Sequence, residues 1–301
     1  MPATLSTSTS SSQSSPSIAD LSIEDWVATA RLGGGPWCDC LLARPAQCPA
    51  DWPADYVLKQ LKPKWRNDPM VLRQICREAQ LAKDVSHPNL SALLAANVQT
   101  ALPYMVFPYI DGVSVRTLLD RQTQLPIAIA LWVVRQASDA LQVVHQAGFR
   151  HADIKPANLL VANNWHVTLI DLGLAQPLCR DADYHQQWLA GSMGYAAPEL
   201  FSVGTEVTEK ADVYSLGVTL YELITGKRPD ASVSSQFDAE RFSPPDGRFL
   251  DLKSACPSAS AELSRLVREM LALPAQGRPA ICTLISRLRR LEMFHLAERT
   301  A

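Results

Sequence analysis

The chain has 301 residues, 47% of them hydrophobic, and a formal net charge of −2. This is enough apolar material for a large core shared by two lobes, and the balanced charge argues against nucleic acid as a partner. The seven cysteines are odd in number and scattered, which favours the reduced thiols of a cytoplasmic protein over a disulfide framework.

The first predicted segment is a tail over residues 1–25. Residues 4–17 include eleven Ser or Thr, so they cannot bury enough apolar surface to offset the entropy of ordering, and we expect disorder. The tail is either inert or a cluster of phosphorylation sites, and the sequence leaves both interpretations open. The N-terminus shows no basic stretch followed by an apolar one, so no secretory signal is expected.

A glycine-rich turn then leads into a strand. Glycines occupy positions 33–35, after Leu32, and the following strand carries Cys38 and Cys40. Taken alone this is a weak signal, because glycine turns are common. The two cysteines could in principle hold a metal ion, but no matching pair lies elsewhere at zinc spacing. We therefore interpret them as small strand residues.

A strand ending in a lysine and a capped helix come next. Residues 56–59 form an apolar strand that ends at Lys59, and Asp68 with Pro69 has the pattern of a helix N-terminus. Glu78 lies on the apolar stripe of that helix. Because a carboxylate on a buried face is costly without a cation, we expect Lys59 to be its partner.

The chain then becomes mainly helical. An apolar strand over 104–107 and a connector over 108–112 precede a long apolar helix over 127–146. The longest apolar run, around 125–134, breaks at Arg135, which is too short for a membrane span. We expect no membrane span.

The most informative run covers residues 151–173. Two β-rich segments separated by a short turn predict a hairpin, which brings Asn158, before its first arm, beside Asp171, after its second. An amide oxygen and a carboxylate at one end of a hairpin form a hard-oxygen site suited to Mg²⁺. Asp153 can reach the same point as a proton acceptor, and Lys155 adds positive charge. This is the arrangement of a phosphoryl-transfer site.

These residues resemble the catalytic loop and metal-binding turn of eukaryotic-like serine/threonine protein kinases, with Ala152 in place of the usual Arg and Leu172 in place of the usual Phe. The resemblance covers about residues 28–290 and suggests a bacterial member. It implies an α+β, bilobal fold: a small β-rich N-lobe with one main helix (about 26–108), a larger helical C-lobe (about 112–291) and a short tail over 292–301.

The resemblance also implies roles for individual residues. The catalytic set would be Asp153, Lys155, Asn158, Lys59 and Glu78, with Asn158 and Asp171 holding Mg²⁺ or Mn²⁺. ATP would be bound by Leu32, Gly33, Gly34, Gly35, Cys40, Val57, Lys59, Phe107, Pro108, Ile110 and Leu160. Ser192, Glu199, Asp212 and Arg278 would order the activation segment and the catalytic loop.

Two of these structural residues, Asp212 and Glu199, are expected to bind specific partners. Asp212 opens a helix that is apolar nearly all round, and in the family this residue holds the backbone of the catalytic loop. A plain charge favoured by the helix dipole is the alternative, and both can be true. Glu199, which closes the Ala-Pro-Glu sequence, would pair with buried Arg278.

The leading hypothesis is an active kinase that transfers the γ-phosphate of ATP to Ser or Thr of protein substrates in bacterial signalling, with a cognate phosphatase as a candidate partner. A pseudokinase acting as a nucleotide-binding scaffold is the alternative, because Cys38 replaces the third loop glycine, Ala152 replaces Arg and Val57 replaces the usual Ala above adenine. A small-molecule kinase is disfavoured, since such enzymes generally lack the Ala-Pro-Glu segment.

The activation loop carries a prediction about regulation. In most kinases the Arg before the catalytic Asp meets a phosphorylated loop residue. Ala152 removes that receptor, and residues 175–191 contain no Ser or Thr, with Tyr184 as the one hydroxyl. We expect the loop to be held by packing, with Leu178, Trp188 and Leu189 as anchors, and the enzyme to be active without loop phosphorylation.

Overall fold

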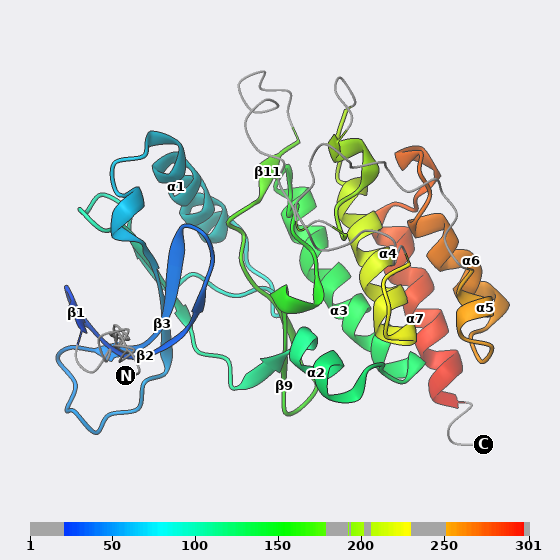
Figure 1. Ribbon diagram of the computed structural model, residues 1–301, viewed down its shortest axis with the longest axis horizontal. Helices are drawn as coiled ribbons and strands as arrows, with labels where there is room; N and C mark the ends of the chain where they lie inside the picture. Colours follow the sequence, from blue (N-terminus) through cyan, green and yellow to red (C-terminus); the bar gives the residue numbers. More distant parts are fainter. Residues whose placement is uncertain (1–20, 179–191, 193, 202–205, 230–250, 298–301) are drawn as a thin grey trace, which may run out of the picture.

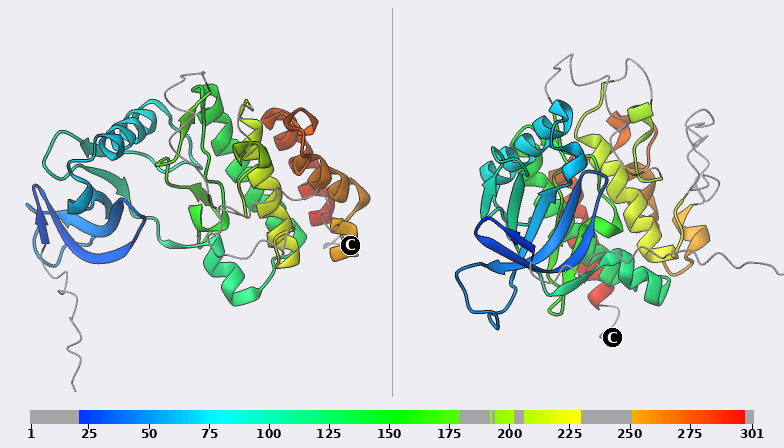
Figure 2. Two further views of the ribbon diagram at one scale, coloured as in Figure 1. Left: turned by 45° about the horizontal axis from the view of Figure 1, so that its top comes forward. Right: turned by 60° about the vertical axis from the view of Figure 1, so that its left-hand side comes forward.

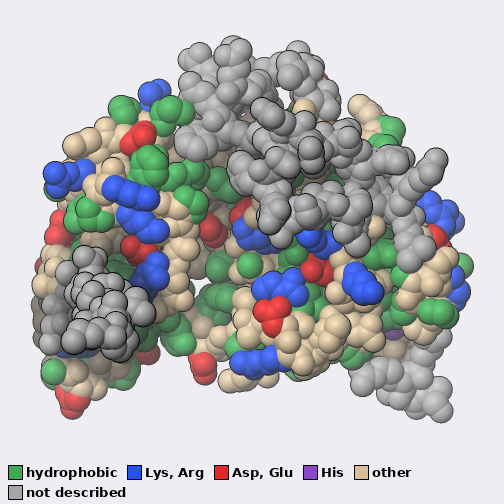
Figure 3. Space-filling view, in the orientation of Figure 1, with side chains coloured by type: hydrophobic (Ala, Val, Ile, Leu, Met, Phe, Trp, Pro, Cys, Tyr) green, Lys and Arg blue, Asp and Glu red, His purple; other side chains and the backbone are tan. Residues whose placement is uncertain are grey.

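The computed structural model describes residues 21–178, 192, 194–201, 206–229 and 251–297. They form two lobes, a β-rich N-terminal lobe with one long helix and a larger helical lobe (Figures 1 and 2). The bilobal α+β fold predicted from the sequence is therefore confirmed. In the space-filling view the surface is notched between the lobes (Figure 3).

The N-lobe is a six-stranded antiparallel sheet covered by one helix. Its strand order is β1-β2-β3-β4-β6-β5, and the strands are β1 (Leu21–Ile23), β2 (Trp26–Gly34), β3 (Cys38–Pro45), β4 (Tyr56–Leu61), β5 (Ala95–Asn97) and β6 (Tyr104–Pro108). The helix α1 (Pro69–Asp84) follows the short 3-10 turn η1 (Pro63–Trp65). As predicted, the Asp68 side chain caps α1, accepting hydrogen bonds from the N–H groups of Met70 and Val71.

The C-lobe is built around two buried helices. Its helices are α2 (Val115–Gln122), α3 (Ile127–Gln146), α4 (Lys210–Thr225), α5 (Leu252–Ala255), α6 (Ala261–Met270) and α7 (Ile281–Ala297). Every residue of α4 from Ala211 to Ile224 is buried or nearly so, so its apolar character on all sides reflects neighbours on all sides. Three short strands, β7 (Gly112–Ser114), β9 (Leu159–Ala162) and β10 (Val167–Leu169), form a sheet in the order β10-β9-β7. A second ladder joins β8 (Phe149–Arg150) to β11 (Gln176–Pro177).

Both predicted domain boundaries need correction. Strand β1 lies inside the segment that was predicted to be a tail over 1–25, because residues 21–23 pair with residues 26–28 across a tight turn. Three residues are too few to show alternation in the sequence. At the other end α7 continues to Ala297, past the predicted boundary at 291. The rest of the expected tails, residues 1–20 with their Ser/Thr cluster and residues 298–301, lies outside the described residues.

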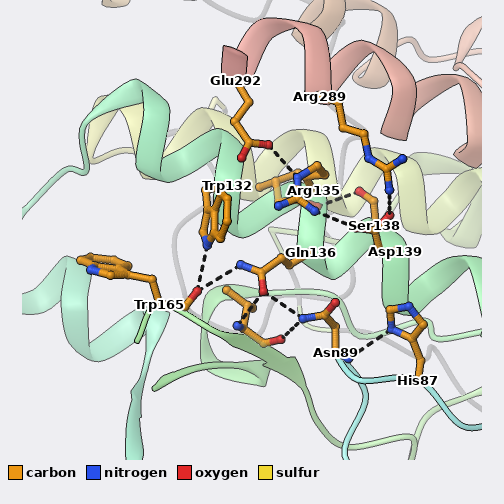
Figure 4. Close-up of polar contacts among 12 residues, drawn as sticks. His87, Asn89, Trp132, Arg135, Gln136, Ser138, Asp139, Trp165, Arg289 and Glu292 are labelled. Atoms are coloured by element: carbon orange, nitrogen blue, oxygen red, sulfur yellow. Dashed lines mark hydrogen bonds and ion pairs between the residues drawn. The ribbon is translucent and has the colours of Figure 1, made fainter. Parts of the chain in front are cut away.

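A buried polar network fixes the β9–β10 hairpin to α3 (Figure 4). The side-chain oxygen of Gln136 accepts hydrogen bonds from Asn89 Nδ2 at 2.9 Å and from the Val167 N–H at 3.1 Å. Its amide nitrogen donates to the carbonyl of Trp165, which also accepts from Trp132 Nε1 at 2.8 Å. The turn of the hairpin therefore cannot shift without breaking bonds to the central helix.

Ion pairs then hold α3 against α7. Arg135 Nε lies 2.6 Å from Glu292 Oε2, and Arg289 lies 3.2 Å from Asp139 (Figure 4). Of the described helices, α3 is the one long and apolar enough to cross a membrane, and 61% of that apolar window is buried inside the fold. A core helix of a soluble protein passes the same test, so the finding is weak evidence for a span.

Candidate active site

The predicted hairpin is present and brings its two flanking residues together. Leu159 pairs with Leu169 at its open end, and the N–H of Ile170 donates to the carbonyl of Asn158 at 3.0 Å. The sequence predicts a return strand over residues 165–170, but the strand begins at Val167, because Trp165 has a φ of 63° and belongs to the connection between the two arms. Asn158 and Asp171 therefore leave the same end of the hairpin.

The carboxylate of Asp153 is held by donors on both oxygens. Oδ2 accepts from Lys155 Nζ at 2.7 Å and from Asn158 Nδ2 at 2.9 Å. Oδ1 accepts from both the N–H and the hydroxyl of Ser192, at 3.0 and 2.8 Å. Lys155 Nζ also contacts the Ser192 hydroxyl at 2.6 Å. Ser192 therefore contacts both members of the Asp153–Lys155 pair.

Asn158 and Asp171 suit a divalent cation. The amide nitrogen of Asn158 donates to the backbone and side chain of Asp153, which leaves its amide oxygen as the atom that can bind a metal. The Asp171 side chain is 45% exposed. Two hard oxygens with room for phosphate and water are the partial protein ligand set that Mg²⁺ or Mn²⁺ takes at nucleotide sites.

The predicted ion pair between Lys59 and Glu78 is present at 2.5 Å, and Lys59 Nζ also lies 2.7 Å from Asp171 Oδ1. Burial alone would lower the pKa of Lys59, but the neighbouring carboxylates of Asp171 and Glu78 raise it well above its ordinary value. Partial burial would raise the pKa of Asp171, yet the charge of Lys59 and hydrogen bonds from Lys59 and the Gly173 N–H lower it to about 2. The lysine stays cationic and Asp171 stays ionised near neutral pH.

Gly173 occupies a position where a side chain has no room. A Cβ there would lie 2.8 Å from Asp171 Oδ1 and 3.1 Å from both Glu78 Oε2 and Lys59 Nζ. The carbonyl of Gly173 accepts a hydrogen bond from Gln74 on α1. The predicted metal-binding turn is thus packed against the helix that carries Glu78, a contact that the sequence did not reveal.

Asp212 holds the catalytic loop, as the family resemblance implied. Its Oδ1 accepts from the N–H of Ala152 at 2.9 Å, and its Oδ2 from the N–H of His151 and from His145 Nε2, both at 2.8 Å. Burial would raise the pKa of Asp212, but the hydrogen bonds and charges of the two histidines, together with the His151 N–H, lower it. His145, on α3, escaped the sequence reasoning because it fits the polar side of a helix pattern.

The glycine-rich hairpin is anchored by side chains that the sequence did not single out. Its turn is closed by Gly35 N–H donating to the Cys38 carbonyl at 2.9 Å. Lys62 Nζ donates to the Gly35 carbonyl at 2.6 Å, and Trp65 Nε1 to the Pro36 carbonyl at 3.0 Å. The loop is therefore tied to the segment that leads into α1.

Of the three glycines in this hairpin, the middle one, Gly34, is the one whose position has no room for a side chain. A Cβ at Gly34 would lie 2.6 Å from the Cys38 carbonyl, whereas nothing lies within 4 Å at Gly33 or Gly35. Burial raises the pKa of the Cys38 thiol to about 12 and also raises that of Cys40. Both thiols are therefore protonated near neutral pH.

The expected adenine pocket draws half-buried residues from both lobes. Val57 pairs with Phe107 across β4 and β6, and Leu160 lies on β9 of the C-lobe. Leu32 is 46% exposed. Among the described residues, no hydrogen bond engages the N–H of Ile110, which keeps it available to a ligand. The predicted lining residues thus lie on the strands and connector that border the cleft.

The predicted pair of Glu199 and Arg278 is present and buried. The guanidinium binds both carboxylate oxygens, at 2.5 and 2.8 Å. It also donates to carbonyls of Ala272, Leu273 and Lys210. A fully buried, bidentate arginine of this kind fixes the end of the activation segment to the C-lobe.

Residues 45–287 match the family model described as "Protein kinase domain". The chain belongs to the protein kinase family. The match begins after the glycine-rich hairpin, so it covers the lysine strand and everything C-terminal to it that the site uses.

Bacterial serine/threonine-protein kinases are among the relatives of the chain. The chain is 32% identical to PknB of Mycolicibacterium smegmatis over 235 residues, which cover 74% of this chain and 36% of that protein. It is 30% identical to PrkC of Bacillus subtilis over 66% of this chain and 30% of that protein. The chain thus spans about a third of the length of these relatives. They confirm the resemblance to bacterial eukaryotic-like kinases.

The fold matches solved kinase domains. The kinase domain of Mycobacterium tuberculosis PknI aligns with a TM-score of 0.67, covering 90% of this chain and 98% of that one at 23% identity. At this identity the likeness supports the fold alone.

Proposed function

We propose that this protein is an ATP-dependent serine/threonine kinase that transfers the γ-phosphate of ATP to protein hydroxyls in bacterial signalling. The observation that carries the proposal is the carboxylate of Asp153, which Lys155, Asn158 and Ser192 hold in one orientation. A carboxylate fixed by four hydrogen bonds beside a hard-oxygen metal site is suited to orient an attacking hydroxyl.

In this mechanism Asp153 accepts the hydrogen bond of the substrate hydroxyl and takes up its proton as the hydroxyl oxygen bonds to the γ-phosphorus. The bond from that phosphorus to the β–γ bridging oxygen breaks, and ADP leaves. Lys155 stabilises the negative charge that develops on the transferred phosphoryl oxygens. Lys59, held by Glu78, binds the α- and β-phosphates. A Mg²⁺ or Mn²⁺ ion held by Asn158 and Asp171 supplies the remaining charge neutralisation when it is bound.

The nucleotide is assigned to the cleft between the lobes. Glycines 33–35 cover the phosphates, and Val57 and Cys40 lie above the adenine with Leu160 below it. The connector supplies the adenine hydrogen bonds through the carbonyl of Pro108 and the N–H of Ile110. Pro108 is compatible with this because only its carbonyl is used.

Lys155 indicates the class of substrate, and the cysteines indicate the cellular compartment. Lys155 beside the catalytic carboxylate supports Ser and Thr over Tyr as acceptors, so we assign protein Ser/Thr hydroxyls as substrates and a phosphatase as the partner that reverses the reaction. The six described cysteines are free thiols, which supports a reducing compartment such as the cytoplasm.

The proposal is tested by incubating the purified protein with Mg-ATP and a generic protein substrate, and by mapping phosphorylated residues with mass spectrometry. We expect phosphate on Ser and Thr with the wild type and with Asp120→Asn, a surface control whose side chain is 64% exposed. We expect none with Asp171→Asn. ATP binding by the wild type without any transfer would overturn the kinase proposal in favour of the pseudokinase scaffold.

A further inference from the structure

Arg150 is a buried cation that has no carboxylate partner among the described residues. It is 4% exposed, and among the described residues no Asp or Glu lies within ion-pairing distance of it. Nη1 donates to the carbonyl of Val207 at 2.7 Å, and Nη2 donates to the side-chain oxygen of Gln176. Its Nε is buried and has no hydrogen-bond partner in the described structure. Within the described part of the chain, the guanidinium is therefore bound only through Nη1 and Nη2, and both acceptors are neutral.

The two acceptors belong to segments that frame the active site. Gln176 starts β11, shortly after the metal-binding turn, and its backbone already pairs with Arg150 across the β8–β11 ladder. The ladder is extended by Leu178 N–H, which donates to the Gly148 carbonyl at 2.8 Å. Val207 lies on the approach to α4, whose Asp212 holds the catalytic loop. One side chain thus joins the strand before the catalytic loop, the start of the activation segment and the approach to α4.

Burying the charge of Arg150 costs desolvation free energy. Burial lowers the pKa of the Arg150 guanidinium, and the charges of Asp212 and Glu199, each already engaged elsewhere, oppose that shift. An apolar side chain of similar volume would avoid the desolvation cost, since a buried charge is weak evidence for stability. The position therefore favours a role that an apolar residue could not fill.

The position of Arg150 relative to Ala152 suggests that role. Ala152 stands where the family resemblance calls for an arginine, and it is buried with a φ of 64°. Arg150 lies two residues earlier, where its side chain reaches the start of the activation segment. We propose that Arg150 is a positioning residue that replaces the arginine missing at 152, holding the activation segment to the catalytic loop through neutral acceptors and without a phosphate. This inference rests on the proposed kinase function and concerns how that activity is regulated.

The test compares Arg150→Met, Gln176→Leu and the double variant with a matched control, Arg44→Met. Arg44 is a similarly buried N-lobe arginine that donates to the Cys48 carbonyl, away from the catalytic loop. For each protein, kcat, the KM values for ATP and peptide, thermal stability and amide hydrogen exchange are measured.

We expect Arg150→Met to lower kcat by about tenfold or more, because small displacements of the catalytic loop are amplified in the rate. The KM for ATP should stay within about threefold, and exchange should rise at residues 174–178 while α3 stays protected. The kcat of the double variant should match that of Arg150→Met within about twofold, since the two substitutions remove the same contact between Arg150 and Gln176. Arg44→Met should leave kcat unchanged.

A kcat of Arg150→Met within about twofold of wild type would overturn the proposal. So would additive losses in the double variant, or faster exchange spread equally over α3 and α4, which is the sign of a purely structural role. If the wild type itself transfers no phosphate, the kinase function fails. The exchange at residues 174–178 relative to α3 then still decides whether Arg150 holds the segment.

Discussion

Ser192 and Asp153 are joined twice, because both the N–H and the hydroxyl of Ser192 donate to Asp153 Oδ1. The activation segment therefore touches the catalytic carboxylate directly. With Oδ2 occupied by Lys155 and Asn158, the carboxylate cannot rotate without losing hydrogen bonds.

The first prediction concerns this carboxylate. Asp153→Asn should lower kcat by on the order of a hundredfold or more with little change in ATP affinity, because proton acceptance is lost and nucleotide binding is not. Steady-state kinetics and equilibrium ATP binding are the measurements. Near-normal turnover in the variant, with a fold verified by circular dichroism, would remove Asp153 from the catalytic role.

A second prediction concerns the nucleotide pocket. Val57 is larger than the usual Ala above adenine, and Cys38 replaces a loop glycine, so we expect a KM for ATP of roughly hundreds of micromolar. Val57→Ala should lower that KM, with kcat nearly unchanged. A low-micromolar KM in the wild type would show that these two departures do not weaken binding.

The third prediction concerns activation. The protein stripped by a phosphatase, which is then removed, should phosphorylate a peptide as well as the untreated protein. Phosphate on Ser192 would put negative charge against Asp153, so that residue is unsuited to be an activating site. Any autophosphorylation should fall mainly between Thr4 and Ser17.

The contrary result for activation is specific. If the stripped protein is inactive and recovers only when Tyr184 or Ser192 becomes phosphorylated, packing alone does not hold the loop. Leu178 is bound at the base of the segment, whereas the other expected anchors, Trp188 and Leu189, lie outside the described residues.

A fourth prediction follows from the pKa of Asp171, lowered to about 2. A carboxyl group whose folded pKa lies below its unfolded value near 4 stabilises the fold above that unfolded value and loses the contribution as pH falls toward the folded pKa. Wild type should therefore exceed Asp171→Asn in urea stability by a constant margin between about pH 5 and 8. The margin should shrink below about pH 4. A margin that grows toward low pH would contradict the assigned direction.

The fifth prediction tests the network behind the hairpin. Gln136→Leu leaves the buried Val167 N–H without its acceptor and should cost about 1–3 kcal/mol in urea unfolding. Gln80→Leu is the control, since Gln80 is exposed and bonds to Asp84 on its own helix, and should change stability by less than about 0.5 kcal/mol. Equal effects in the two variants would show that the network does not secure the hairpin.

Local patterns predicted much of this structure. The helix over 127–146 was predicted to the residue, because its apolar stripe is long and ends at a turn. The cap at Asp68 was predictable because Asp before Pro is typical of a helix N-terminus. The pair of Lys59 with Glu78 was predictable because a buried carboxylate on a helix face requires a cation. Each of these inferences needed residues close in sequence or one obvious partner.

The missed features carry no hydrophobic pattern in the sequence. Strand β1 is three residues long and is defined by its pairing with β2. The end of α7 buries Glu292 and His295 and exposes Met293 and Phe294, so the sequence there shows no apolar stripe. Gln136 and Arg150 are polar residues whose burial depends on partners remote along the chain. Hydrophobic periodicity gives no information about such partners, which become visible only in the folded structure.

The connector between the lobes has very little free chain. Tyr109 is bound to the N-lobe through its N–H and the Asp55 carbonyl at 2.8 Å, and Gly112 pairs with Ala162 in the C-lobe sheet. Only Ile110 and Asp111 remain to bend when the cleft opens. Ile110 is also the residue assigned to bind adenine, so a bound nucleotide contacts the hinge directly. Release of the product nucleotide and opening of the cleft are therefore coupled.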